Sequence, residues 1–214
     1  MKKVNYSLMY VTDERITDHT QFLNVLESSL KGGASIVQLR EKKLNTKQFY
    51  LRAIAVKKLC AKYNTPLIIN DRIDIALAID AYGVHIGQKD MPVCIARTLL
   101  GKNKIIGWSV SNEEQAVEAN NLAVNYIGLS PIFKTETKIR DLDTPLGVEG
   151  LKKIKKLSNK FIICIGGIDK SNTAKLIQNG SDGVAIVSAI SQANNPEQAT
   201  QQLKEIICQT GTKQ

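Results

Sequence analysis

Eight short apolar segments alternate with eight segments of helical periodicity along this 214-residue chain, and this alternation limits the fold more than any other feature. The apolar segments are nearly continuous runs, which is typical of parallel strands covered on both faces. The predicted strands are 6–12, 35–39, 66–71, 83–87, 104–110, 125–132, 161–165 and 183–188. The predicted helices are 18–31, 46–63, 72–82, 92–100, 111–123, 147–157, 171–180 and 196–208.

Eight such units in about 210 residues predict an α/β fold, a single (β/α)8 TIM barrel that spans residues 1–214. The rival is a doubly wound open sheet, which usually carries a glycine-rich fingerprint after its first strand. Residues 11–15 (VTDER) contain no glycine, and no linker or change of composition divides the chain. One barrel domain is therefore expected.

Polar residues that accept hydrogen bonds from free backbone amides indicate where several helices begin. Residues 111–114 have the S-x-x-E form of a capping box, which predicts Ser111 as the cap. The predicted start residues are Thr17 or Asp18, Asn45 or Thr46, Ser111, and Asp169 or Ser171.

Bulk composition narrows the class of protein. Hydrophobic residues make up 43% and charged residues 23%, as in ordinary globular proteins. No apolar run reaches the length that crosses a membrane, and the first residues resemble a strand rather than a signal peptide. The four cysteines form no CxxC or Cys/His metal pattern, so we expect reduced, mostly buried thiols in a cytoplasmic protein.

The formal charge of +9 raises the question of nucleic-acid binding. The lysines are dispersed in pairs along helical segments, and aromatic residues make up only 5%, too few for a base-stacking platform. We therefore expect no nucleic-acid or membrane partner. A positive field also attracts small phosphorylated substrates, which remain as the alternative.

Two aspartates follow neighbouring predicted strands in the segment 66–90. Asp71 ends one strand and Asp90 follows the next, so a βαβ unit would bring both carboxylates to one edge. Mg²⁺ is usually held by one or two carboxylates, water and phosphate oxygens. Either aspartate can instead be a helix cap, since both precede helical segments. Both interpretations stay open at this point.

Polar residues gather at the carboxyl ends of the predicted strands, where TIM barrels build their active sites. This rim contains no cysteine, and His85 lies within a strand, so a Ser/His/Asp set has little support. The inventory suits an anionic ligand, a diphosphate, together with a metal. Taken singly, each feature also fits an ordinary turn, ion pair or surface loop. The rim residues are Gln38, Arg40, Lys42, Asn70, Asp71, Gln88, Asp90, Ser109, Thr135, Thr137, Lys138, Gly166, Gly167 and Ser188.

Seven ordered motifs, from about residue 8 to residue 200, resemble those of the thiamine-phosphate synthase family. The motifs are Gln38-Leu-Arg40-Glu-Lys42, Asn70-Asp71, His85-Ile-Gly87-Gln88-x-Asp90, Gly107-x-Ser109, Pro131-Ile-Phe-x-Thr135-Glu-Thr137-Lys138, Ile165-Gly166-Gly167-Ile168 and Ser188-Ala189-Ile190. The resemblance implies a Mg²⁺-dependent transferase with a (β/α)8 fold. Its implied substrates are 4-amino-2-methyl-5-hydroxymethylpyrimidine diphosphate and 4-methyl-5-(2-phosphoethyl)thiazole, or the carboxylated thiazole phosphate. Its implied products are thiamine phosphate and pyrophosphate.

The same resemblance implies roles for particular residues. Asp71 and Asp90 would bind Mg²⁺, and Gln38 would lie near the pyrimidine. The implied reaction must also exclude water, and the polar loop of residues 133–145 would serve as a lid. The diphosphate would be held by Arg40, Lys42, Asn70, Ser109 and Lys138, of which Arg40, Lys42, Ser109 and Lys138 are the predicted catalytic residues. The thiazole phosphate would be held by Thr135, Thr137, Gly167, Val187 and Ser188.

Two alternative functions remain at this level. A related thiazole tautomerase shares the barrel but lacks the full diphosphate and metal set. A non-catalytic protein that binds a thiamine-type ligand can use the same scaffold, because a fold does not determine function. The sequence leaves open whether the protein is a homo-oligomer.

Overall fold

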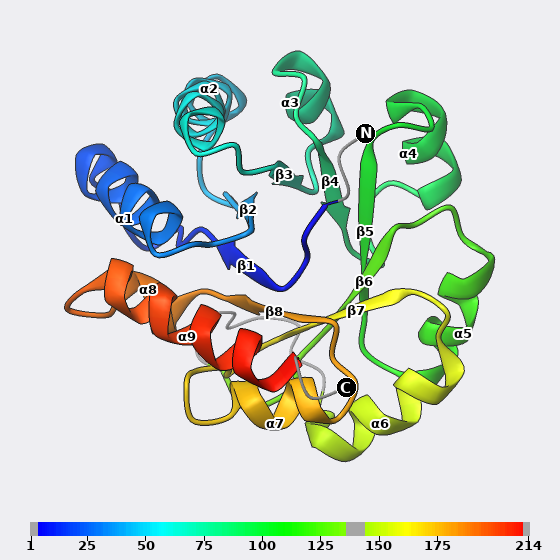
Figure 1. Cartoon of the computed structure of the whole chain (residues 1–214). Coiled ribbons are helices and arrows are strands. Elements are labelled where there is room, and N and C mark those ends of the chain that lie inside the picture. The colour runs from blue at the N-terminus through cyan, green and yellow to red at the C-terminus, as the bar shows by residue number, and fades with distance from the viewer. Residues whose placement is uncertain (1–3, 136–143, 212–214) are drawn as a thin grey trace.

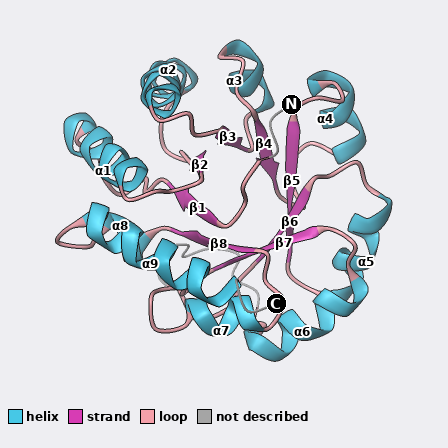
Figure 2. Ribbon diagram, viewed as in Figure 1, coloured by secondary structure: helices cyan, strands magenta, loops and turns pink. Residues whose placement is uncertain are grey.

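A computed structural model describes residues 4–135 and 144–211 of the chain. Eight parallel strands close into a barrel in sequence order, with β8 pairing to β1, and the helices surround the strands as an outer ring (Figures 1 and 2). The predicted TIM barrel is confirmed. The strands are β1 (Leu8–Val11), β2 (Ile36–Leu39), β3 (Leu67–Asn70), β4 (Gly83–Ile86), β5 (Ile105–Val110), β6 (Tyr126–Leu129), β7 (Phe161–Ile165) and β8 (Gly183–Ile186).

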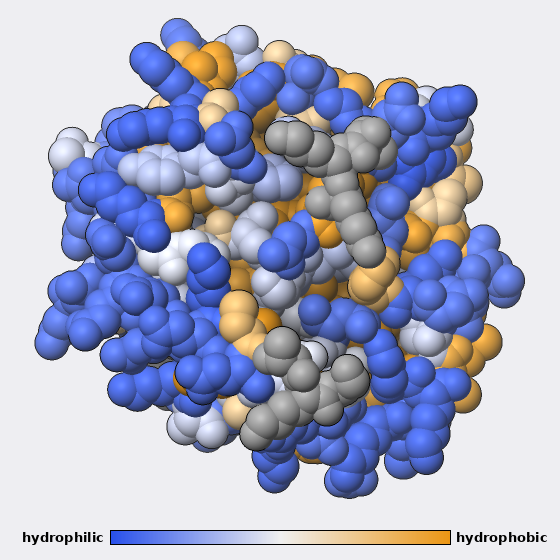
Figure 3. Space-filling view, viewed as in Figure 1, coloured by the Kyte–Doolittle hydropathy of each residue, from blue (hydrophilic) through white to orange (hydrophobic). Residues whose placement is uncertain are grey.

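Helices α1 to α7 lie between consecutive strands, α8 and α9 follow the last strand, and together they cover the outside of the barrel. Hydrophilic side chains cover most of the helical ring on the face seen in Figure 3. Within the described residues no helix is long and apolar enough to cross a membrane. The helices are α1 (His19–Lys31), α2 (Thr46–Lys62), α3 (Ile73–Ala78), α4 (Val93–Leu100), α5 (Glu113–Asn121), α6 (Gly147–Leu157), α7 (Thr173–Gln178), α8 (Ser188–Ser191) and α9 (Pro196–Gly211).

Side chains alternate between the two faces of each strand, and this creates two separate cores. The larger core lies between strands and helices. The smaller one fills the barrel interior and consists of Met9, Val11, Ile36, Ile68, Ile105, Tyr126, Ile163 and Ala185. Two residues beyond Ile36 and Ile68, the same alternation places the polar side chains Gln38 and Asn70 inside the barrel. The apolar interior therefore supports a polar layer at the carboxyl ends of the strands.

Several predicted helix starts are correct and others are wrong. Asp18 caps α1, and Asn45 caps α2 through a full capping box with Gln48. Ser111 was the wrong choice for α5: Asn112 is the cap, because its side chain accepts the Gln115 amide while the Gln115 side chain accepts the amide of Ser111.

Other predicted boundaries also needed correction. Helix α7 begins at Thr173 rather than at Asp169 or Ser171, because the Asp169 carboxylate accepts the Ser171 amide in a turn before the helix. Helix α3 ends at Ala78, two residues before Asp80 adopts a left-handed backbone with φ +49°. The short helix α8, which starts at Ser188, was not predicted.

The four cysteines are free thiols, but only two of them are buried. Cys60 and Cys164 lie in the core, where burial raises the pKa of each thiol to about 12. Cys94 and Cys208 are exposed on helices α4 and α9. The expectation of mostly buried thiols is therefore only half correct.

Candidate active site

A cavity of about 690 Å³ opens at the carboxyl ends of the strands. Every predicted site residue within the described part of the chain lines it. Thr137, Lys138 and most of the predicted lid, residues 133–145, lie outside the described residues. The predicted residues that the structure brings together are Gln38, Arg40, Lys42, Asn70, Asp71, Asp90, Ser109, Thr135, Gly167, Val187 and Ser188.

The two aspartates do not cap helices, so the simpler interpretation of them is wrong. Helix α3 is preceded by Arg72 and helix α4 by Pro92, and neither helix has a side-chain cap. Asp71 adopts a left-handed backbone with φ +60°, and its amide donates to the His85 carbonyl at 2.8 Å, which extends the β3–β4 ladder. The Asp71 carboxylate is thereby held beside β4.

Asp90 is held on the same side of the cavity. Its Oδ2 accepts the Gly87 amide at 2.7 Å. Burial raises the pKa of Asp90, and the neighbouring Asp71 carboxylate raises it further, while the Gly87 amide and Lys42 oppose the change. Two carboxylates are therefore close enough to repel each other, which a bound cation would relieve.

This pair fits Mg²⁺ by its donor chemistry. Mg²⁺ takes hard oxygen ligands and commonly keeps several waters, so one or two protein carboxylates suffice. In residues 4–135 and 144–211 no cluster of three Cys, His, Asp or Glu side chains is arranged to hold a metal ion. Such a cluster would be expected for an all-protein metal cage. Two carboxylates at an open mouth instead suit a metal that is shared with a phosphate ligand.

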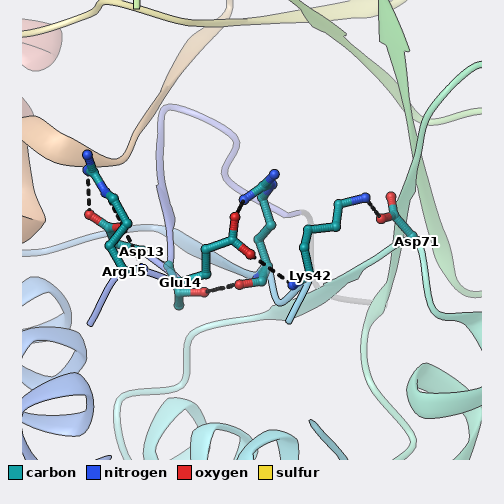
Figure 4. A network of polar contacts seen from close by, with 7 residues as sticks. Asp13, Glu14, Arg15, Lys42 and Asp71 are labelled. Carbon is teal, nitrogen blue, oxygen red and sulfur yellow. Dashed lines mark hydrogen bonds and ion pairs between the residues drawn. The ribbon is translucent and has the colours of Figure 1, made fainter. Parts of the chain in front are cut away.

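Two cationic side chains, Arg40 and Lys42, come from the loop after β2 and line the same cavity as the carboxylates. Lys42 Nζ forms an ion pair with Asp71 Oδ2, and Arg40 Nη1 donates to Glu14 Oε1 at 2.7 Å. Figure 4 shows Lys42 extended toward Asp71, with Glu14 on the other side of Lys42. About half of the Lys42 side chain is exposed, so it can turn from Asp71 to an incoming anion.

Glu14 is a cavity residue that the sequence analysis missed. It follows β1 and accepts hydrogen bonds from both Arg40 Nη1 and the Lys42 backbone amide, the latter at 2.9 Å. This carboxylate fixes the start of the loop that carries both cations. The nearby Asp13 carboxylate accepts hydrogen bonds from Arg15 and from Ser191 of α8. The loop after β1 is thereby joined to the helix that follows β8. The sequence offers no signal for Glu14 beyond its place after the first strand.

His85 is the second missed residue. It was set aside because it lies within a strand, but its side chain points into the barrel and lines the cavity. Its Nε2 is 3.0 Å from Ser109 Oγ, and its Nδ1 is 3.0 Å from the Tyr126 hydroxyl. Burial lowers the pKa of His85 to about 4, so the ring is neutral near pH 7.

The opposite side of the mouth is formed after β7 and β8. Gly166 and Gly167 both have positive φ, and a Cβ at Gly167 would lie 2.5 Å from the Lys134 carbonyl oxygen. The two glycines therefore let the chain turn closely beneath the loop that carries Thr135. Val187 and Ser188 stand next to them where β8 passes into α8. These residues form a second polar region across the cavity from the carboxylates.

Together these features define a class of protein: a (β/α)8-barrel enzyme whose mouth suits a metal-bridged diphosphate on one side and a second small anion on the other. Comparison with known proteins specifies it further. The model of the family described as "Thiamine monophosphate synthase" matches residues 8–190. The chain belongs to this family.

Individual relatives extend over nearly the whole chain. The chain is 43% identical over 203 residues to the thiamine-phosphate synthase of Clostridium novyi (strain NT), covering 95% of this chain and 99% of that protein. It is 47% identical to the thiamine-phosphate synthase of Methanobrevibacter smithii, covering 95% and 96%. Among solved structures, thiamine phosphate pyrophosphorylase from Pyrococcus furiosus superposes with a TM-score of 0.87 at 32% identity, covering 97% and 98%.

Proposed function

We propose that this chain is a transferase with thiamine-phosphate synthase activity and that it works by dissociative loss of diphosphate. Its substrates are 4-amino-2-methyl-5-hydroxymethylpyrimidine diphosphate and 4-methyl-5-(2-phosphoethyl)thiazole or its carboxylated form. Identity above 40% to two thiamine-phosphate synthases over nearly their full lengths supports the activity. The cytoplasmic location and the single domain 1–214 remain sequence predictions.

One observation supports the route more than any other: both signs of charge meet at one side of the cavity. Asp71 and Asp90 crowd together there, and Lys42 reaches Asp71. A diphosphate alone would be repelled by the carboxylates, and a metal alone would be repelled by Lys42 and Arg40. A metal–diphosphate pair satisfies both sets at once. This is the ligand that the charge distribution favours.

In the proposed route the bond between the pyrimidine CH₂ and the diphosphate oxygen breaks first, and the electron pair leaves with the diphosphate. The thiazole nitrogen then donates its electron pair to the resulting carbocation. No protein nucleophile is needed, which agrees with a cavity lining that contains no cysteine among the described residues. What the chain must supply is stabilisation of the developing negative charge.

Arg40 and Lys42 would bind the departing diphosphate as permanent cations, and Asn70 and Ser109 would donate neutral hydrogen bonds to it. Mg²⁺ held by Asp71 and Asp90 would act as a Lewis acid that neutralises charge on the same oxygens. Gln38, inside the barrel on β2, would contact the pyrimidine. The predicted contribution of Lys138 to this set stays a prediction.

The thiazole phosphate would bind at the second polar region. Gly167, Val187, Ser188 and Thr135 line this region. The first three would bind the phosphate through their backbone amides, and Thr135 and the predicted Thr137 would add hydroxyl groups. Anchoring the phosphate here would leave the thiazole ring to extend toward the pyrimidine carbon. The two charged ends of the substrates would then lie on opposite sides of the cavity, with the reacting atoms between them.

The test combines purified protein, Mg²⁺ and both substrates, and measures thiamine phosphate. We expect product with wild-type protein and a loss of at least about a hundredfold in Asp71→Asn, since a charge that binds the metal is removed. Asp74→Asn is the matched control: this aspartate pairs with Arg72 on α3 and does not line the cavity. Isomerisation of the carboxylated thiazole phosphate without condensation would favour a tautomerase. Binding of thiamine phosphate without turnover would favour a non-catalytic protein.

A further inference from the structure

Four polar side chains form a continuous chain across the inside of the barrel. Ser109 Oγ lies 3.0 Å from His85 Nε2, and His85 Nδ1 lies 3.0 Å from the Tyr126 hydroxyl. The Gln38 side chain lies close to the same hydroxyl. The chain thus joins the residue proposed to contact the pyrimidine to a residue proposed to contact the diphosphate. Its two middle members, His85 and Tyr126, have no role in the proposed route.

Glycines on the two neighbouring strands make room for these rings. A Cβ at Gly107 on β5 would lie 2.1 Å from Tyr126 Cζ, and a Cβ at Gly128 on β6 would lie 2.7 Å from His85 Cε1. No alanine could occupy either position unless the ring moved. The two rings also stack, with centroids 5.5 Å apart. The backbone is therefore built around this pair of polar rings, at positions where an apolar side chain would fill a barrel more simply.

The hydrogen bonds that join Tyr126, His85 and Ser109 can all run in the same direction, from Tyr126 toward Ser109. The Tyr126 side chain is buried, so the hydrogen of its hydroxyl group needs an acceptor inside the barrel, and His85 Nδ1 lies 3.0 Å from the hydroxyl oxygen. The Tyr126 proton then goes to His85 Nδ1. A neutral histidine carries one proton, which must be on Nε2 and be donated to Ser109 Oγ.

This direction determines what Ser109 can do. Because its oxygen accepts from His85, its own hydrogen is free to point into the cavity. Ser109 Oγ lies next to Gly87 and Asp90, at 3.9 Å from where a Gly87 Cβ would be. In the opposite tautomer the serine would donate its hydrogen to His85 and offer the diphosphate only a lone pair.

We propose that His85 and Tyr126 are positioning residues that set the His85 tautomer and thereby aim the Ser109 hydrogen at the departing diphosphate. The inference deepens the proposed function, since it assigns the leaving group as the partner of that hydrogen. Neither residue touches the reacting atoms. Their effect passes through Ser109 and is therefore expected on kcat more than on KM.

The first test is a double-mutant cycle on turnover. Tyr126→Phe removes the proton given to Nδ1, and we expect kcat to fall about ten- to hundredfold, the range for losing one hydrogen bond to a charged group. Ser109→Ala should fall similarly, and the double variant should be no slower than Ser109→Ala alone. Multiplicative losses in the cycle would overturn the proposal.

Tyr10→Phe is the matched control, because Tyr10 is also fully buried but packs outside the barrel interior. It should lower stability without lowering kcat, and an equal loss of kcat in both tyrosine variants would count against a role through Ser109.

Two substitutions of His85 test its hydrogen bond to Ser109 separately from its hydrogen bond to Tyr126. His85→Gln keeps a donor near the Nε2 position and should retain more activity than His85→Leu. Equal activities of these two variants would contradict the proposed donation to Ser109.

The second test measures the tautomer in the wild-type protein, and a variant is used only to assign the signals. A long-range ¹H–¹⁵N spectrum of the histidine rings distinguishes the two neutral tautomers, and the chain has just two histidines, so His19→Gln completes the assignment. We expect His85 to carry its proton on Nε2 near pH 7. A proton on Nδ1 would refute the inference. Absence of thiamine phosphate in the wild-type assay would refute the proposed function instead, whatever the tautomer.

Discussion

Replacing Asp90 by asparagine should make the protein more stable and much less active. The folded state raises the pKa of this carboxyl group, which means that folding opposes its ionisation. Burial is the largest cause, and the neighbouring Asp71 adds to it. Asparagine has nearly the same shape, carries no charge, and keeps an oxygen that can accept the Gly87 amide.

The size of the effect follows from the linkage between pKa and stability. Each unit of pKa difference corresponds to about 1.4 kcal/mol, but Asp90 is only half-buried and solvent screens part of the cost. Weakening the bond to Gly87 offsets a further part. We expect the unfolding free energy to rise by about 0.5–1 kcal/mol at pH 7, or the melting temperature by about 1–4 °C for a chain of this size.

The pH dependence has a definite sign. The folded pKa lies above the unfolded value of 3.8, so the wild-type protein loses the stability contributed by protonated Asp90 as the pH rises through the folded pKa. The stability advantage of Asp90→Asn over the wild-type protein should therefore be fully present at pH 7 and should disappear as the pH falls toward 3.8. Urea unfolding in EDTA at several pH values measures this.

Asp80→Asn is the control, and we expect it to change stability in the opposite direction. The Lys104 side chain lowers the pKa of Asp80, so the loss of this charge should slightly reduce stability. Both variants exchange one oxygen for one nitrogen, so they differ only in environment. If Asp90→Asn proved less stable than wild type at pH 7 in EDTA, the carboxylates could not be in the repulsive arrangement described. Its thiamine phosphate turnover should nevertheless fall at least about a hundredfold.

Three further predictions concern the metal and the packing. Chelation by EDTA should abolish turnover and added Mg²⁺ restore it, with an unchanged circular dichroism spectrum; full activity in EDTA would exclude the metal-assisted route. Arg52→Ala should cost about 3–5 kcal/mol in urea unfolding because it leaves the buried Glu41 carboxylate without its partner at 2.6 Å, and a loss below about 1 kcal/mol would show that water reaches Glu41. Gly128→Ala should lower kcat by displacing the His85 ring, and it should lower the free energy of unfolding by about 1–3 kcal/mol. Gly211→Ala, with open space around it, should change neither quantity. A fully active Gly128→Ala variant would show that the ring is free to move.

The roles predicted from the resemblance still need such experiments, but their placement could be read from the sequence. Gln38, Asn70 and Ser109 lie at the carboxyl ends of apolar segments, and a closed parallel barrel brings all such ends to one mouth. A position within a strand does not by itself show that the His85 side chain reaches the mouth, so the sequence does not predict this residue at the site. Its register opposite Asn70 and Gly107 places it inside the barrel, and Gly107 on β5 and Gly128 on β6 leave space for the rings of Tyr126 and His85.

The sequence by itself determined the number and order of the units and the chemistry at each strand end, because apolar runs and helical periodicity are local properties of the chain. It could not decide whether Asp71 and Asp90 cap helices or face each other, since both uses leave the same local pattern. Tertiary structure decided that question, and it also decided that Glu14 holds Arg40 and that Tyr126 reaches His85 across 41 residues of sequence. Those contacts depend on barrel closure and on which face of each strand turns inward, and both are set by pairing between segments far apart in the chain.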